Sequence, residues 1–192
     1  MIHLIGPGGA GKSTLGATLA RRLALTYVDL DSRFLAEHGV IGEYIGQHGY
    51  RSYAASNVAL YLRIIRGVSS PVVMVMSSGF MTYEPDIHPL YPRLHDDILR
   101  DTRTIVVLPS LSLEECVRET LRRQRERAFA GAPAREETKI RQRFPVYAAM
   151  SLRKVETMRG VDALCEELVP WLMQPATGLK YNVACGDSEP EL

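Results

Sequence analysis

The stretch Gly6-Pro7-Gly8-Gly9-Ala10-Gly11-Lys12-Ser13 decides the fold of this chain. Its spacing is that of a phosphate-binding loop, G-x-x-x-x-G-K-[ST]. Glycines let the backbone take positive φ and approach a ligand closely, so that successive N–H groups can point into one anion site. In such a loop Lys12 would reach the β- and γ-phosphates of a nucleotide, and the Ser13 hydroxyl would ligate Mg²⁺. We therefore expect nucleotide contacts from Gly8, Gly9, Ala10, Gly11, Lys12, Ser13 and Thr14.

The residues around this loop alternate between predicted strands and predicted helices. A strand over 2–5 precedes the loop and a helix over 14–25 follows it. Further strands are expected at 26–28, 72–76, 104–108 and, more weakly, 154–157; further helices are expected over most of 32–67, from 112, over 136–150 and over 162–173 with Asp162 as N-cap. Alternation of this kind predicts an α/β fold with a parallel sheet, which binds ligands at the carboxyl ends of its strands.

Length and composition predict one domain over residues 1–174, followed by a polar tail over 175–192. The net charge is +1, so no global field favours nucleic acid or an anionic membrane. Three widely spaced cysteines, without a signal peptide pattern or an apolar run of membrane-spanning length, predict reduced thiols in a cytoplasmic protein. We expect a small-molecule partner and a monomer or weak dimer.

Two carboxylates follow the second predicted strand. Asp29 and Asp31 are two residues apart and therefore face the same side of that strand. One of them could hold Mg²⁺, directly or through water, and the other could accept a proton from an acceptor hydroxyl. The alternative is that Asp31 only caps the next helix. A cap would not require a second aspartate two residues earlier, which favours phosphoryl transfer.

With these motifs the chain resembles the shikimate kinase family of small P-loop kinases, from residue 1 to about residue 172. The family's Gly-Glu-x-x-Phe-Arg corresponds to a segment ending in His48-Gly49-Tyr50-Arg51, and its Arg-x-Pro-x-Tyr corresponds to Arg143-Phe144-Pro145-Val146-Tyr147. The resemblance implies a three-layer sandwich whose five-stranded parallel sheet has the order 2-3-1-4-5, with a mobile lid over about 124–137. It also implies ATP and Mg²⁺ as cofactors and the conversion of shikimate to shikimate 3-phosphate in aromatic amino acid biosynthesis.

The resemblance further implies roles for residues of the acceptor site. Asp31 would bind the hydroxyl groups of the acceptor and act as the base, with Asp29 nearer the metal. Arg51 and Arg143 would grip the acceptor's carboxylate, and the backbone at Gly79 would contact the acceptor.

Two arginines near the lid complete the predicted site. The segment Arg127-Ala128-Phe129 resembles the lid motif of the family, so Arg127 would join Lys12 in stabilising the transferring phosphoryl group. Arg123 would stack on the adenine. Most other arginines between 118 and 143 alternate with glutamates, as on a solvated helix face.

The chain departs from the family on the acceptor side. Ser77-Ser78-Gly79 replaces three glycines, and Ala54 replaces a glutamate. The nucleotide side is intact. Two alternatives to a shikimate kinase therefore remain open: a P-loop kinase for another small hydroxylated molecule, such as a gluconate-like acid or a polyol, or a nucleotide-binding sensor with little turnover.

Overall fold

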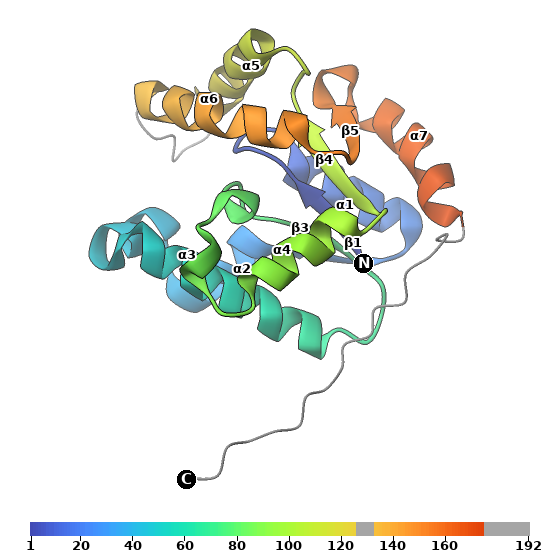
Figure 1. Ribbon diagram of the computed structural model, residues 1–192. Coiled ribbons are helices and arrows are strands. Elements are labelled where there is room, and N and C mark those ends of the chain that lie inside the picture. Colours follow the sequence, from blue (N-terminus) through green and yellow to red (C-terminus); the bar gives the residue numbers. More distant parts are fainter. Residues whose placement is uncertain (126–132, 175–192) are drawn as a thin grey trace.

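The computed structural model describes residues 1–125 and 133–174, in which five parallel strands form one sheet (Figure 1). The strands are β1 (Ile2–Ile5), β2 (Thr26–Asp29), β3 (Val72–Val75), β4 (Thr104–Leu108) and β5 (Arg153–Glu156). Their order is β2-β3-β1-β4-β5. Leu4 in the central strand pairs with Val75 on one side and with Ile105 on the other. The predicted fold and strand order are confirmed.

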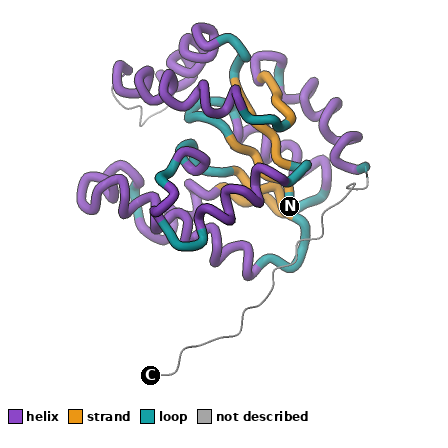
Figure 2. The backbone as a smooth tube through the Cα atoms, viewed as in Figure 1, coloured by secondary structure: helices purple, strands orange, loops and turns teal. Residues whose placement is uncertain are grey.

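Burial on both faces of the sheet explains the three layers. Along β3, Val72 and Met74 pack into one core cluster, whereas Val73 and Val75 pack into the other. The first cluster is covered by α2 (Leu30–His38), α3 (Ile41–Gly67), α4 (Tyr91–Arg100), α5 (Leu113–Arg125) and α6 (Pro133–Ala149), and the second by α1 (Lys12–Leu23) and α7 (Val161–Met173). The strands accordingly lie between helices in Figure 2.

Glycines divide the helical segment predicted over 32–67. Gly39, with φ 81°, ends α2, and Gly49, with φ 80° and ψ 161°, interrupts the helical geometry inside α3. Gly42 and Gly46 keep helical geometry. The kink at Gly49 directly precedes Tyr50 and Arg51, so it changes the direction of the helix at the point where these two residues begin its second part.

The structure differs from the prediction in two places. No helix was expected between the strands at 72–76 and 104–108, where the chain forms short 3₁₀ turns at Phe80–Thr82 and Pro85–Ile87 and then the helix α4 from Tyr91 to Arg100. The prediction of Asp162 as an N-cap is wrong. Gly160, with φ 89°, is the N-cap of α7, and Asp162 lies in the first turn, where it pairs with Arg22 over 2.5 Å.

Candidate active site

The phosphate loop joins β1 to α1, and its packing excludes any side chain at two positions. Gly6 has φ 146°, and a Cβ there would lie 2.2 Å from the carbonyl oxygen of Val107. Gly9 has φ 73°, and a Cβ there would lie 2.6 Å from Thr120 Cγ2. The positive end of α1 begins at Lys12, directly after this packed backbone. The loop therefore has two features of an anion site, the N-terminus of a helix and a closely packed backbone.

Lys12 and Ser13 connect the loop to its surroundings. The buried Lys12 ammonium donates to the carbonyl oxygens of Gly6, over 2.7 Å, and Pro7, over 2.9 Å. The Ser13 hydroxyl donates to Asp29 Oδ2 over 2.7 Å. Hydroxyl and carboxylate oxygens are ligands that Mg²⁺ prefers. The two residues predicted to hold the metal are thus in direct contact beside the phosphate loop.

The two aspartates have different surroundings. Asp29 caps α2, because its Oδ1 accepts from the Ser32 N–H over 3.1 Å, and its Oδ2 also accepts from the Tyr27 hydroxyl over 3.2 Å. Asp31 lies in the first turn of α2, and its Oδ1 accepts a 2.5 Å hydrogen bond from Ser77. The helix cap is therefore Asp29, and capping does not account for Asp31.

The chemistry of Asp31 suits a proton acceptor. Burial raises the pKa of Asp31 above its usual value, and the nearby Asp29 carboxylate acts in the same direction. The Ser77 hydrogen bond, the Lys12 charge and the Tyr53 hydroxyl lower the pKa of Asp31 in part. A carboxylate with a raised pKa takes up a proton more readily near neutral pH.

The predicted acceptor residues Gly79 and Arg143 lie together. Arg143 in α6 donates from Nη1 to Ser78 Oγ and from Nη2 to the Tyr50 hydroxyl, each over 3.1 Å. A Cβ at Gly79 would lie 2.4 Å from the Tyr50 hydroxyl oxygen and 2.9 Å from Arg143 Nη2, so a larger residue there would displace the ends of these two side chains. Ser77, which binds Asp31, precedes this group in the chain. The turn over residues 77–79 therefore joins the candidate base to the candidate carboxylate partner.

Arg51 points elsewhere. Its guanidinium forms hydrogen bonds of 3.1 and 2.9 Å with the two carboxylate oxygens of Asp86, and another of 3.2 Å with the carbonyl oxygen of Asp86. This pairing holds the pKa of the Asp86 carboxyl below its usual value. The structure thus places Arg143, but not Arg51, against the turn over residues 77–79.

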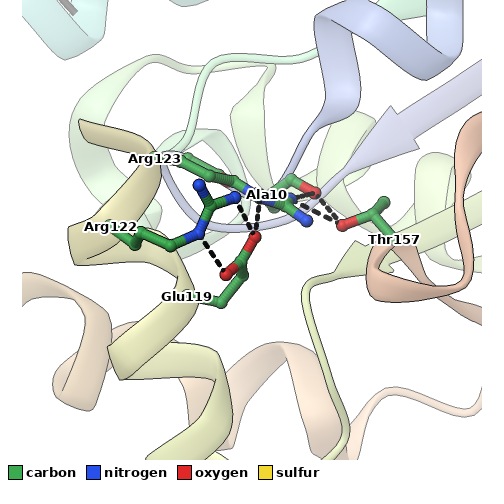
Figure 3. A network of polar contacts seen from close by, with 6 residues as sticks. Ala10, Glu119, Arg122, Arg123 and Thr157 are labelled. Carbon is green, nitrogen blue, oxygen red and sulfur yellow. Dashed lines mark hydrogen bonds and ion pairs between the residues drawn. The ribbon is translucent and has the colours of Figure 1, made fainter. Parts of the chain in front are cut away.

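Arg123 lies against the backbone of the phosphate loop (Figure 3). Its Nη1 donates to the carbonyl oxygen of Ala10 over 3.3 Å and to Thr157 Oγ1 over 2.8 Å. The Thr157 hydroxyl donates to the same carbonyl over 2.8 Å. Glu119 accepts from Arg123 Nε over 2.7 Å and from Arg122 over 2.8 Å, and these bonds, that of Arg122 foremost, lower the pKa of Glu119 to about 2. The network fixes one wall of the loop.

A small cavity of about 50 Å³ lies between the phosphate loop, the turn after β3 and α6. Pro7 and Gly8 line it from the loop, and Ser78 and Arg143 line it from the acceptor side. Residues 126–132 of the predicted lid, Arg127 among them, lie outside the described residues, as does the tail over 175–192.

Sequence reasoning missed three contributors to this site. The Tyr50 hydroxyl accepts a hydrogen bond from Arg143, and the Tyr53 hydroxyl lowers the pKa of Asp31. Glu119 accepts a hydrogen bond from Arg123. A signal existed for Tyr50, because tyrosine stands where the resembled motif has phenylalanine. No local pattern indicated Tyr53, which acts on Asp31 from another helix. Glu119 lies one helical turn from Arg122 and Arg123, a spacing that the alternation of arginine and glutamate already contained.

The phosphate loop and the residues Asp31 and Arg143 are arranged for transfer of a phosphoryl group from a nucleotide to a hydroxyl. A protein with this fold and this site is a P-loop kinase. A model of the shikimate kinase family matches residues 8–173. The chain belongs to the shikimate kinase family.

Relatives of known structure and sequence agree with this assignment. The chain is 32% identical to the shikimate kinase of Stenotrophomonas maltophilia over 138 residues, which cover 70% of this chain and 68% of the relative. Identity to the shikimate kinase of Bradyrhizobium diazoefficiens is 26% over 180 residues, covering 89% and 78%. The solved shikimate kinase of Acinetobacter baumannii in complex with shikimate matches with a TM-score of 0.66 at 20% identity, covering 92% and 94% of the two chains, and so shares the fold.

No helix within residues 1–125 or 133–174 is long and apolar enough to cross a membrane.

Proposed function

We propose that this protein phosphorylates shikimate with ATP to give shikimate 3-phosphate. The observation that carries the proposal is the turn over residues 77–79, where adjacent hydroxyls contact the two charged groups that a hydroxylated acid requires. Ser77 donates to Asp31, and Ser78 accepts from Arg143. Ser78 also borders the cavity beside Gly8 of the phosphate loop. Membership of the shikimate kinase family supports shikimate as the acceptor.

The nucleotide side fits ATP and Mg²⁺. Loop residues Gly8 to Thr14 would bind the phosphates, because the close-packed glycines leave backbone N–H groups as the lining. Lys12 would exchange the carbonyls of Gly6 and Pro7 for phosphate oxygens. Ser13 and Asp29 would hold Mg²⁺, which neutralises charge on the transferring phosphate when bound. Arg123, whose Nη1 binds the carbonyl oxygen of Ala10, would stack on the adenine.

The acceptor side assigns one role to each charged group. Asp31 would take the proton of the acceptor hydroxyl while that oxygen bonds to the γ-phosphorus and the bond to the leaving oxygen of ADP breaks. Arg143 would bind the carboxylate, and the backbone at Gly79, beside Arg143, would contact the acceptor. Arg51 would join them only by exchanging Asp86 for the substrate.

The remaining parts of the proposal concern the surroundings of the reaction. Arg127, in a lid over about 124–137, would stabilise the transferring phosphoryl group, as lid arginines do in phosphoryl transfer. We infer a cytoplasmic monomer or weak dimer. Cys116 and Cys165 support this location, because both are buried free thiols.

The test is ADP formation from Mg-ATP by the purified protein, with shikimate, with gluconate and without an acceptor. Strong stimulation by shikimate is the expected result. Stimulation by gluconate but not by shikimate would show that the acceptor is a gluconate-like acid and not shikimate. Absence of stimulation by either, with ATP binding intact, would favour a sensor.

The variant Asp31→Asn tests the proposed base. We expect shikimate-dependent turnover to fall roughly 10²–10⁴-fold, the usual contribution of a general base, while the dissociation constant for ATP changes less than about twofold. Asp86→Asn is the matched control, because it removes a carboxylate that contacts Arg51 and not Asp31. Equal turnover in Asp31→Asn and the wild type would contradict the role of Asp31.

A further inference from the structure

Arg143 is held on both sides by neutral hydroxyl groups. Its Nη1 donates to Ser78 Oγ and its Nη2 donates to the Tyr50 hydroxyl, each over 3.1 Å. The three residues come from separate segments, namely α6, the turn after β3, and α3 just after its kink. Three segments that are distant in sequence therefore fix the plane of one guanidinium group.

The charge of Arg143 is not neutralised by these contacts. Within residues 1–125 and 133–174, no carboxylate forms an ion pair with Arg143, whereas Arg123 pairs with Glu119 and Arg141 with Glu114. A guanidinium has five N–H donors, and two hydroxyl partners leave the others for a further acceptor. An arginine that is oriented but not paired is prepared to bind an anionic group bidentately.

Tyr50 adds a donor beside this charge. Burial raises the pKa of the Tyr50 hydroxyl, with the Arg143 charge opposing it, so the hydroxyl keeps its proton at neutral pH. A hydroxyl that accepts from Arg143 can donate its own hydrogen outward. A Cβ at residue 79 would lie 2.4 Å from the Tyr50 oxygen, so the glycine leaves room for the Tyr50 hydroxyl in its present position.

We infer that Tyr50 and Ser78 are specificity-determining positioning residues, which orient Arg143 to receive a single carboxylate of the acceptor, with the Tyr50 hydroxyl as an additional donor. The inference rests on the proposed function, because it concerns the same acceptor site. Both hydroxyls stand at positions where the sequence departs from the family motifs, which have phenylalanine and glycine there. The acceptor class is a small hydroxylated molecule with one carboxylate.

Kinetics of Tyr50→Phe, Ser78→Ala and the double variant test the inference. Each single change removes one hydrogen bond to a charged group, and we expect the KM for shikimate to rise roughly 3–15-fold. The KM for ATP should change less than about twofold. Because both hydroxyls hold one guanidinium, the double variant should raise the KM for shikimate by less than the product of the single effects.

Tyr44→Phe is the matched control, because its hydroxyl binds Ser56 within α3 and not the acceptor residues. It should leave both KM values unchanged. An unchanged KM for shikimate in both single variants, or an equal rise in the two KM values for shikimate and ATP, would overturn the inference.

A measurement on the free protein separates the inference from the proposed function. In NMR spectra of ¹⁵N-arginine-labelled protein, Arg143, assigned by its loss in Arg143→Lys, should show slower guanidinium rotation than the exposed Arg66. Tyr50→Phe and Ser78→Ala should each speed this rotation. If the wild type does not phosphorylate shikimate, the proposed function fails, and slow rotation of Arg143 still supports its orientation by the two hydroxyls. Rotation as fast as that of Arg66 would overturn the inference whatever the substrate.

Discussion

Among single residues, Glu119 shows how a group outside the reaction supports the phosphate loop. It binds Arg122 and Arg123, and Arg123 in turn binds the carbonyl oxygen of Ala10 (Figure 3). These bonds lower the pKa of Glu119 from 4.5 to about 2, with the Arg122 hydrogen bond as the largest cause. The ionised form is therefore favoured in the folded protein.

We expect Glu119→Gln to lower the free energy of unfolding at pH 7 by about 2 kcal/mol, because charged hydrogen bonds are lost. Since the folded pKa of Glu119 is lowered, its contribution is complete above pH 4.5 and disappears as pH falls towards about 2. Urea denaturation of the wild type and of Glu119→Gln at several pH values measures the free energy of unfolding of each.

The difference in the free energy of unfolding between the two proteins should shrink only below pH 4.5. Glu43→Gln, at an exposed position, is the control. A difference that does not change with pH would contradict the prediction.

The charged residues of the site could be predicted from the sequence, but their partners could not. The loop, Asp29, Asp31 and Arg143 belong to short motifs with fixed spacing, and the structure brings Asp31 and Arg143 to the same turn. Their partners Ser77 and Tyr50 lie 46 and 93 residues away from them. Such contacts depend on the packing of α3 and α6 around the sheet, which no local pattern contains.

Among the elements, α3 depends on the backbone at Gly49. The values φ 80° and ψ 161° lie in a region that residues with a Cβ rarely adopt. Nothing lies within 4 Å of a Cβ built at Gly49, so the constraint is conformational and not steric crowding. Tyr50 follows directly, which makes the kink part of the acceptor site.

Gly49→Ala should destabilise the protein by roughly 1–3 kcal/mol, through strain at positive φ, and should raise the KM for shikimate by displacing Tyr50. Gly46→Ala is the control within the same helix, with open space around it and helical geometry. It should be neutral or stabilising by up to about 1 kcal/mol. Thermal unfolding and acceptor kinetics of both variants decide this. Equal stability of the two variants would show that the kink carries no strain.

The elements themselves were largely predictable, and the errors have local causes. Continuous apolar runs identified β3 and β4, because strands buried on both faces carry no polar alternation. Of the four glycines at 39, 42, 46 and 49, all of which were expected to break the helical segment over 32–67, Gly42 and Gly46 stay inside α3 with helical geometry. The start of α7 was misplaced because Gly160, and not the acidic Asp162, takes the non-helical conformation before it.

At the scale of the whole molecule, the phosphate loop and the turn after β3 pack against different cores. Ala10 of the loop lies in the cluster beneath α1 and α7, whereas Phe80, which follows the turn, lies in the cluster beneath α3. A ligand that contacts both the loop and the turn should therefore stabilise both cores.

Saturation with Mg-ATP at about 100 times its dissociation constant should raise the free energy of unfolding by about 2.7 kcal/mol. For a chain of this size the melting temperature should rise by roughly 5–10 °C. Thermal unfolding with and without Mg-ATP measures the shift, and Lys12→Ala should abolish most of it. A shift of the same size in Lys12→Ala would place the nucleotide away from the loop.

The position of β1 in the middle of the sheet also has a consequence for synthesis on the ribosome. The first strand of the chain pairs with β3, where Ile2 faces Val73, and with β4, where His3 faces Thr104. At about 5–20 residues per second, its second neighbour is translated roughly 5–20 seconds after it. During that interval an apolar segment that is fully buried in the finished protein has no sheet partner on that side, so the nascent chain needs protection from aggregation while it grows.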